Sequence, residues 1–153
     1  MYSVRPLAAS SSGEVDALAG IFDRYRVHYG EADDPERSAR WLTQNLGPGR
    51  LQAFMAEDDS TVVGFATVIQ IPASLRLGHF WQIRDLFVLP THRRHGIASA
   101  LLEAVRSAAA ASGALRLVLQ TEDNNEGALN LYRRAGYVPI TGYRGLVLPI
   151  SQS

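Results

Sequence analysis

The segment from residue 80 to residue 135 places the strongest constraint on the fold of this chain. An apolar run at 80–89 is followed by helical spacing at 97–112, by a second apolar run at 115–120 and by helical spacing at 125–135. Two strands joined through a helix lie parallel in a sheet that helices cover. The segment therefore predicts an α/β protein with at least one parallel pair of strands.

The flanking regions predict further strands, of which the early ones pair antiparallel. Alternation at 2–7 favours a first strand, and runs at 51–57 and 61–71 favour a hairpin around 58–60. The remaining expected elements are helices that begin at Glu14 and after Asp34, and final strands at 137–140 and 145–150. Together these patterns predict a mixed, twisted sheet covered by helices.

Length and charge limit the organisation and the partners of the chain. Its 153 residues match one domain, so residues 1–153 are expected to form a single unit. Fifteen Lys and Arg residues balance fifteen Asp and Glu residues, which predicts neither a nucleic-acid partner nor a membrane partner. No apolar run has the length of a membrane span and no secretion signal is recognisable, so we expect a cytoplasmic protein.

Missing residue types exclude several kinds of chemistry. The chain contains 0 Cys, which rules out disulfides, thiolate metal sites and an acyl-cysteine intermediate. All its basic residues are Arg, so a lysine Schiff base and a Walker-type phosphate loop are excluded as well. His92 and His95 lie three residues apart without a third ligand cluster, and we expect no metal site.

A basic turn between the strand at 80–89 and the following helix is the first candidate site. Arg93 and Arg94 supply positive charge, and Gly96 allows a ligand to approach the backbone. The start of a helix carries free N–H groups and a partial positive charge, which suit a phosphate. The turn predicts an anion site, with a solvated loop as the alternative.

The second candidate site lies on the helix expected at 125–135. Ala128 and Tyr132 are four residues apart and share one face of that helix, and Asn125 begins it on roughly the same side. A small residue and a phenol on one face can flank an extended ligand. A half-buried core tyrosine is the alternative interpretation of Tyr132.

Together the two sites resemble the signatures of the GNAT superfamily, the Gcn5-related N-acetyltransferases. The acyl-CoA signature of that family, Gln or Arg, two residues, Gly, one residue, then Gly or Ala, is matched by Arg93, Gly96 and Ala98. A second family pattern, Asn-x-x-Ala-x-x-Leu-Tyr-x-x-x-Gly-Phe/Tyr, is filled by Asn125, Ala128, Leu131, Tyr132, Gly136 and Tyr137. The resemblance spans nearly the whole chain. It implies a mixed, mostly antiparallel sheet whose central strands splay apart to form an acyl-CoA cleft.

The resemblance implies acetyl-CoA as acyl donor and an N-acetyltransferase activity by direct attack of a primary amine in a ternary complex. The amine belongs to a small molecule or a protein, and having no Cys supports direct attack. Tyr132 is implied to protonate the departing thiolate. The implied donor-binding residues are Leu86, Phe87, Val88, Arg93, Arg94, His95, Gly96, Ile97, Ala98, Ser99, Asn125, Ala128 and Tyr132.

The attacking amine must lose a proton, so a general base or a water chain is required. Asp85 is the first candidate because it directly precedes the donor-binding segment, and Glu57, His79 and Glu122 are the others. Each of these four can instead be an ordinary solvated carboxylate or loop histidine.

The acceptor side offers further candidates. Tyr25, Arg26 and Tyr29 are expected in a connection between the first two helices, a region that walls the acceptor pocket in the family. Arg84 stands where diamine and polyamine acetyltransferases tend to carry an acidic residue. A cation facing the pocket there disfavours polyamines and leaves a less cationic amine, or an acceptor that bears a carboxylate, open.

Two other functions compete with an acetyltransferase. The chain could be a non-catalytic module that binds or senses acyl-CoA, or another kind of nucleotide-binding domain that uses the same helix start. Tyr132 favours the enzyme, because a pure binding module has no need of an acid beside the sulfur. Many members of the family are homodimers, so a homodimer is a further expectation from the resemblance.

Overall fold

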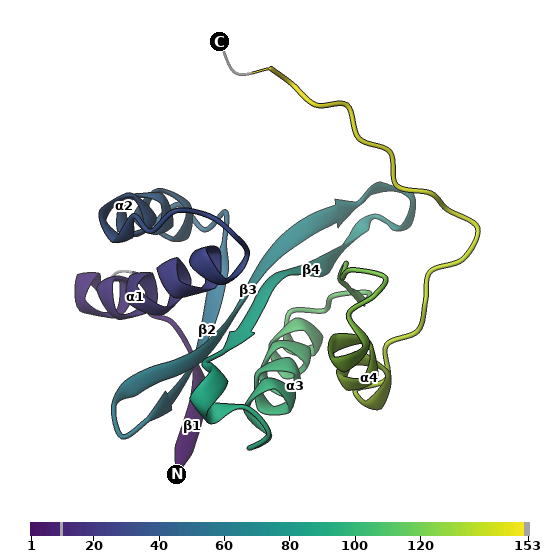
Figure 1. The fold of residues 1–153 in the computed structure, drawn as a ribbon. Helices are drawn as coiled ribbons and strands as arrows, with labels where there is room; N and C mark the ends of the chain where they lie inside the picture. Colours follow the sequence, from purple (N-terminus) through teal and green to yellow (C-terminus); the bar gives the residue numbers. More distant parts are fainter. Residues whose placement is uncertain (10, 152–153) are drawn as a thin grey trace.

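A five-stranded mixed sheet forms the centre of the computed structural model, which describes residues 1–9 and 11–151 (Figure 1). The strands follow one another in the sheet in chain order: β1 (Tyr2–Pro6), β2 (Gln52–Asp58), β3 (Thr61–Ala73), β4 (Gly78–Val88) and β5 (Leu117–Val118). The first four strands pair antiparallel, and β4 and β5 pair parallel. The mixed, mostly antiparallel sheet expected from the sequence is confirmed.

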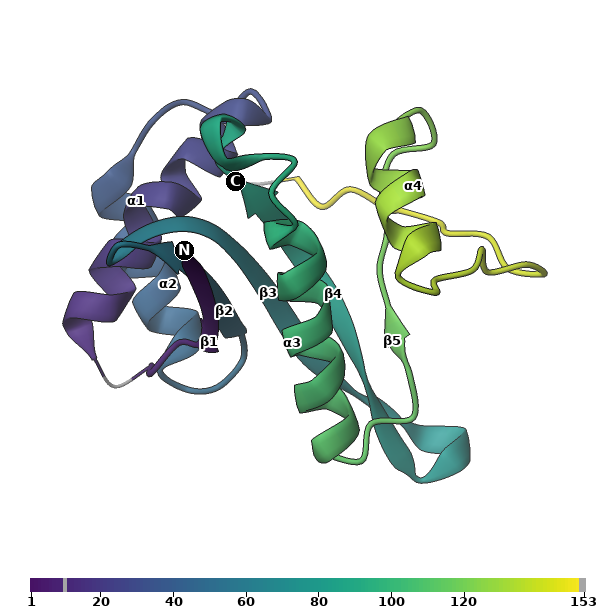
Figure 2. The same ribbon diagram turned by 90° about the horizontal axis from the view of Figure 1, so that it is seen from below.

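Helices cover both faces of this sheet. They are α1 (Ser12–His28), α2 (Pro35–Leu46), α3 (Ile97–Ala111) and α4 (Glu126–Arg134), with single 3₁₀ turns η1 (Ser74–Arg76) and η2 (Pro90–His92). The pair α1 and α2 lies on one side of the sheet and α3 on the other, with α4 beside β5 (Figures 1 and 2). Within the described ranges, none of these helices combines the length and the apolar character needed to cross a bilayer.

The first helix is longer than the sequence analysis expected. Residues 25–28, expected in a connection, form the last turn of α1, because no helix breaker occurs before Gly30, where the backbone turns with a φ of +93°. Tyr25 and Arg26 are therefore helical residues, and Tyr29 is the C-terminal cap. This extension carries Tyr25 along the sheet as far as β4, where its hydroxyl meets Asp85.

The pairing of β4 is irregular on both of its edges. Toward β3, Asp85 faces Thr67 and Ile83 faces Val68, so Arg84 is one extra residue, a β-bulge. Toward β5, pairing is limited to Trp81 with Leu117 and Gln82 with Val118. Beyond these two pairs β4 and β5 separate, as the sequence resemblance implied for the central strands (Figure 2).

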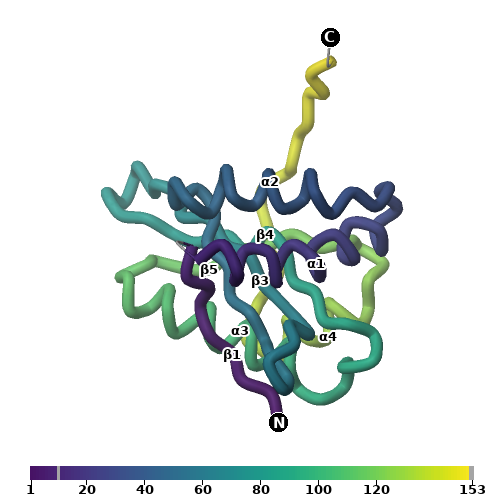
Figure 3. The backbone as a smooth tube through the Cα atoms, turned by 90° about the vertical axis from the view of Figure 1, so that its left-hand side faces the viewer, coloured from purple at the N-terminus to yellow at the C-terminus, as the bar shows by residue number. Residues whose placement is uncertain are grey.

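Two expected strands at the C-terminus are absent from the described structure. Residues 137–140 and 145–150 form neither strand nor helix, and the chain leaves the body after α4 in an extended course (Figure 3). The strand expected at 115–120 is likewise reduced to Leu117–Val118. A strand needs a hydrogen-bonding partner along its edge, and local alternation alone does not supply one.

A packing prediction follows from the contact between β3 and α3. A Cβ atom added at Gly64 would lie 3.2 Å from Ile97 Cγ2 and 3.3 Å from Leu101 Cδ1, and both of these side chains are buried. We expect Gly64→Val to lower the free energy of unfolding by about 1–3 kcal/mol through overpacking. Urea denaturation measures the change.

The matched control is Gly20→Ala on the exposed face of α1. A Cβ atom there has nothing within 4 Å, so removal of a helical glycine should raise the free energy of unfolding by about 0.5–1 kcal/mol. Equal stability of wild type and Gly64→Val would contradict the tight packing of α3 on β3.

Candidate active site

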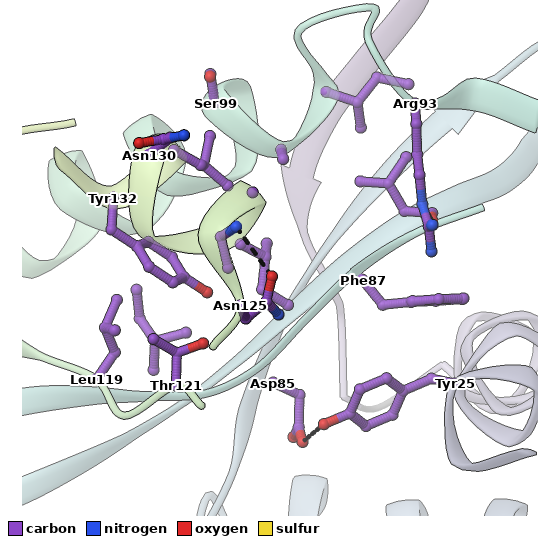
Figure 4. A pocket seen from close by; sticks show the side chains of 18 of the residues that line it. Tyr25, Asp85, Phe87, Arg93, Ser99, Leu119, Thr121, Asn125, Asn130 and Tyr132 are labelled. Atoms are coloured by element: carbon purple, nitrogen blue, oxygen red, sulfur yellow. Dashed lines mark hydrogen bonds between the residues drawn. The ribbon is translucent and has the colours of Figure 1, made fainter. Parts of the chain in front are cut away.

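A cleft of ≈ 1030 Å³ opens where β4 and β5 separate (Figure 4). Its floor is the bulged half of β4 and the segment that follows β5. The start of α3, one face of α4 and the end of α1 form its walls. The chain passes from the end of β4 through α3 to β5, and this crossover connection places the start of α3 at the mouth of the cleft.

Most residues singled out in the sequence line this cleft. From the expected donor site these are Leu86, Phe87, Val88, Arg93, Arg94, Gly96, Ile97, Ala98, Ser99, Asn125, Ala128 and Tyr132. From the expected catalytic and acceptor groups they are Tyr25, Tyr29, Arg84, Asp85 and Glu122. Segments about one hundred residues apart in the chain are thus brought to one cavity.

Two of the expected acceptor residues are held elsewhere by ion pairs. Arg26 Nη1 lies 2.9 Å from Asp23 Oδ1 at the end of α1 and does not line the cleft. Glu57 on β2 accepts two hydrogen bonds from Arg5 of β1, each at 3.1 Å. Because Glu57 belongs to a strand two positions away from β4, the structure does not bring it to the cleft.

Two histidines also lie outside the cleft. His79 is at the start of β4, at the opposite end of the strand from the bulge, and its Nε2 is 3.1 Å from Ser112 Oγ. His95 is exposed on the turn before α3 and does not line the cavity. Neither ring is placed to act on a ligand in the cleft.

The start of α3 is built as an anion site. Gly96 adopts a left-handed conformation with a φ of +79°, and Arg94 does so with a φ of +65°. No side chain caps the first turn of α3, whereas Ser11, Asp34 and Asn125 cap α1, α2 and α4. The first N–H groups of α3 therefore remain available to a ligand, and the helix dipole favours a negative one.

The side chain of Arg93 is fixed beside β4. Its Nε donates a hydrogen bond to the carbonyl oxygen of Val88 at 3.1 Å, and its guanidinium carbon lies 5.8 Å from the ring centre of Phe87. These contacts use one N–H of the guanidinium and leave the others to face an anion. Positive charge is thus held at the same end of the cleft as the start of α3.

Tyr132 projects from α4 into the middle of the cleft, above Leu119 and Thr121 (Figure 4). Its ring packs edge-on against Tyr137, with the ring centres 5.8 Å apart. Burial raises the pKa of Tyr132 to about 12, with smaller contributions from Tyr29, Tyr137 and Glu122. The phenol is therefore protonated at every physiological pH.

Asn125 is the N-cap of α4. Its Oδ1 accepts the backbone N–H of Ala128 at 3.1 Å, which fixes the side chain at the rim of the cleft. The carboxamide oxygen keeps a second lone pair, so both the oxygen and the amide nitrogen can meet a ligand.

Asp85 is held from two sides at the other end of the cleft. Tyr25 Oη donates to Oδ1 at 2.8 Å, and Thr67 Oγ1 donates to Oδ2. Burial raises the pKa of Tyr25 far above its ordinary value, and the negative charge of Asp85 raises it further. Tyr25 thus remains a hydrogen-bond donor, and the carboxylate is fixed in one orientation.

Sequence reasoning did not single out two residues of this region, Thr67 beside the carboxylate and His28 in the wall of the cleft. Thr67 is fully buried on β3, and its position opposite Asp85 depends on the bulge at Arg84. His28 lines the cleft three residues after Tyr25, with its ring centre 5.7 Å from that of Phe87. Extension of the first helical pattern by one turn would have indicated His28, whereas Thr67 has no local signal.

The cleft is therefore polar along its length. Arg93 and the start of α3 contribute positive charge to its lining, Tyr132 contributes a neutral donor, and Asp85 and Glu122 contribute carboxylates. Among the residues that the structure describes, no cluster of three His, Cys, Asp or Glu side chains is arranged to hold a metal ion. This arrangement suits a long ligand with an anionic end and a second, amine-bearing ligand.

Known proteins are similar to this chain in sequence and in fold. The family model for the acetyltransferase (GNAT) family matches residues 16–137. An uncharacterized N-acetyltransferase of Bacillus subtilis, YhfO, is 31% identical over 134 residues, covering 88% of this chain and 90% of that protein. The chain belongs to the GNAT family and is an acyltransferase.

Solved structures agree with this assignment. The crystal structure of a probable acetyltransferase superposes with a TM-score of 0.90 at 27% identity, covering 99% of both chains. A predicted acetyltransferase from Clostridium acetobutylicum, solved with acetyl-CoA, has the same fold with a TM-score of 0.74 at 19% identity over 96% of each chain.

Proposed function

We propose that this protein transfers the acetyl group of acetyl-CoA to a primary amine by direct attack in a ternary complex. The observation that carries the proposal is one cleft that holds an uncapped helix start, the phenol of Tyr132 and the fixed carboxylate of Asp85. Membership of the GNAT family supports the proposal. The acceptor is an amine of a small molecule or of a protein.

The residues present fit acetyl-CoA. Free N–H groups from Arg94 to Ser99 are suited to a pyrophosphate, with Arg93 adding positive charge. On the side toward β5, backbone groups of residues 86–88 have no strand partner, because the pairing ends at Gln82, and they can bond the amides of a pantetheine arm. Asn125 lines the same cleft, and its side-chain amide can add a hydrogen bond to that arm.

Bound acetyl-CoA supplies an activated acetyl group: attack by the amine forms a carbon–nitrogen bond, breaks the carbon–sulfur bond, and leaves a proton on nitrogen and a negative charge on sulfur. The bulge leaves Arg84 without a partner in the β3 ladder, so a backbone N–H group at the bulge is available to a ligand. Such a group can stabilise negative charge that develops on the carbonyl oxygen during the attack.

Tyr132 acts on the sulfur side as a hydrogen-bond donor. An alkyl thiol has a pKa of about 8.5, well below the pKa of about 12 of this phenol. Complete proton transfer from Tyr132 to the thiolate is therefore uphill. A charge-assisted hydrogen bond from the phenol still lowers the energy of the developing thiolate.

Asp85 acts on the nitrogen side. Its two oxygens are oriented by Tyr25 and Thr67, and each retains lone pairs that can accept a further proton or hydrogen bond. Together with Glu122 it attracts a protonated amine, and it accepts the proton that the amine must lose before its lone pair can attack, directly or through a water molecule. The proton that remains on nitrogen after the attack passes to solvent, and the thiolate takes up a proton from solvent.

Arg84 and the aromatic residues of α1 limit the acceptor. Arg84 lines the cleft from the bulge of β4, so a polycationic amine would meet a like charge there. Tyr25 and Tyr29 pack edge-on with ring centres 5.1 Å apart and form an aromatic wall of the cleft. These features support an amine of low positive charge, or one that also carries a carboxylate.

The cytoplasmic location expected from the sequence stays a prediction.

Binding of the donor is tested at the start of α3. Gly96→Glu places bulk and negative charge against the proposed pyrophosphate site, so we expect acetyl-CoA binding in the micromolar range for wild type and none for the variant. Isothermal titration calorimetry measures both. The control is Gly113→Glu beyond the other end of α3, where the glycine has the same φ of +79° and nothing lies within 4 Å. No binding by wild type, or equal loss in both variants, would refute the donor site.

The role of Tyr132 is tested by removal of its hydroxyl. We expect Tyr132→Phe to lower kcat by about 10²-fold while acetyl-CoA binding is retained, because the donor acts only on the departing sulfur. Free thiol release with an amine substrate measures turnover. Since the phenol ionises only near pH 12, wild type should show no decline from this group between pH 7 and 10. Wild-type turnover by the variant at every pH would refute this role.

The role of Asp85 is tested against a carboxylate outside the cleft. We expect Asp85→Asn to lower kcat/KM for the amine by about 10²-fold or more, with donor affinity unchanged, because the proton of the amine loses its acceptor. Glu57→Gln, which loses the ion pair with Arg5 but lies outside the cleft, should leave kcat/KM unchanged. Equal effects of the two substitutions would overturn the assignment of Asp85.

A further inference from the structure

Two consecutive residues of β4 carry opposite charges and lie opposite the same residue of β3. In a regular strand, successive side chains point to opposite faces of the sheet. The bulge interrupts this alternation, because Arg84 and Asp85 together occupy the length of strand opposite Thr67. Both residues line the cleft. A guanidinium and a carboxylate are therefore available to one ligand at this point of the cleft.

These two charged groups do not neutralise each other. The carboxylate of Asp85 accepts hydrogen bonds from the hydroxyl groups of Tyr25 and Thr67, which orient it. Arg84 is exposed, and it takes part in no ion pair among the residues that the structure describes. A guanidinium binds a carboxylate through two parallel hydrogen bonds. Arg84 can therefore bind a carboxylate that a ligand brings.

An aromatic cluster, made of Tyr25, His28, Tyr29 and Phe87, adjoins this pair of charges. The ring centre of Phe87 lies 5.7 Å from that of Tyr25 and 5.7 Å from that of His28. Tyr29 packs against Tyr25 and is 53% exposed. Figure 4 shows Tyr25 reaching Asp85 from α1, with Phe87 beside them. The exposed aromatic surface suits an apolar or aromatic group of a ligand.

We propose that the acceptor is an α-amino acid with an apolar side chain, whose carboxylate pairs with Arg84 and whose amine lies at Asp85. The aromatic cluster then contacts the side chain of the amino acid. This assignment rests on the proposed function and narrows its primary amine to one class. Consecutive residues have Cα atoms about 3.8 Å apart, which suits a ligand whose amine and carboxylate are joined to a single carbon.

Other classes of amine leave one of these protein groups without a partner. A polyamine brings a second positive charge toward Arg84. The N-terminus of a protein has its carboxyl group in a peptide bond, so the guanidinium would meet a neutral carbonyl and lose the charge on its partner. A simple monoamine offers the guanidinium nothing. A free amino acid supplies an amine, a carboxylate and an apolar group together.

Matched pairs of amines provide the first test. Phenylalanine and phenethylamine differ only in the carboxylate, and so do leucine and 3-methylbutylamine. We expect kcat/KM of wild type to be about 10–100-fold higher for the amino acid of each pair, because only the amino acid pairs with Arg84. Release of free thiol from acetyl-CoA measures turnover.

The outcomes of this test separate the acceptor class from the proposed function. Equal or faster turnover of the two simple amines would overturn the acceptor class and leave acetyl transfer to amines intact. No turnover of any of the four compounds, nor of other primary amines, would refute the proposed function and the acceptor class with it.

Substitution of Arg84 provides the second test. We expect Arg84→Gln to lower the ratio of kcat/KM for phenylalanine over phenethylamine about 10–100-fold, mainly through KM, and Arg84→Glu to favour phenethylamine. The matched control is Arg24→Gln, an exposed arginine of α1 outside the cleft, which should keep the wild-type ratio. An unchanged ratio in both Arg84 variants would overturn the proposal, whatever their stability.

Binding of the product provides a third test that requires no turnover. N-acetylphenylalanine keeps the carboxylate, whereas N-acetylphenethylamine lacks it. In isothermal titration calorimetry with CoA present, we expect wild type to bind N-acetylphenylalanine more tightly, and Arg84→Gln to bind it about 10-fold more weakly than wild type does. Equal affinity of wild type and Arg84→Gln for N-acetylphenylalanine would show that the carboxylate does not meet Arg84, and would overturn the proposal.

Discussion

The separation of β4 from β5 after two residue pairs is the constraint on which the rest of the site depends. Pairing continued past Gln82 would satisfy the backbone groups of β4 and close the cleft. Because the strands part, these groups face a cavity in place of a neighbouring strand. The parallel crossover leaves from the same end of β4, so the start of α3 must lie at the mouth of that cavity. Backbone groups of β4 and of the start of α3 thus face the same cavity, although no sequence motif marks the point where the strands part.

The second irregularity, the bulge at Arg84, sets the chemistry on the opposite edge of β4. One extra residue turns Asp85 toward Thr67 and Tyr25 and leaves Arg84 at the cleft. The carboxylate is consequently oriented by two donors, while burial raises the pKa of the Tyr132 phenol on α4 to about 12. A negative group for the amine and a neutral donor for the sulfur then lie in one cavity.

The sequence predicted those site residues that belong to one short, recognisable stretch of chain. It did not predict those that reach the site only through contacts between distant elements. The turn at residues 93–99 carries its own signal, since basic residues, a glycine and a following helix are local, and the structure places that helix start at the cleft. The pairing of Thr67 with Asp85 depends on a bulge that no local pattern indicates. Glu57 and His79 were reasonable by residue type, but strand order and position along β4 keep them from the cleft.

Residues 138–150 show a second limit of prediction from sequence. Alternation at 145–150 reports which side chains share a face, and a strand was expected there for that reason. Alternation cannot report where the partner edge lies, and a strand without a partner edge is merely an extended segment with exposed apolar side chains.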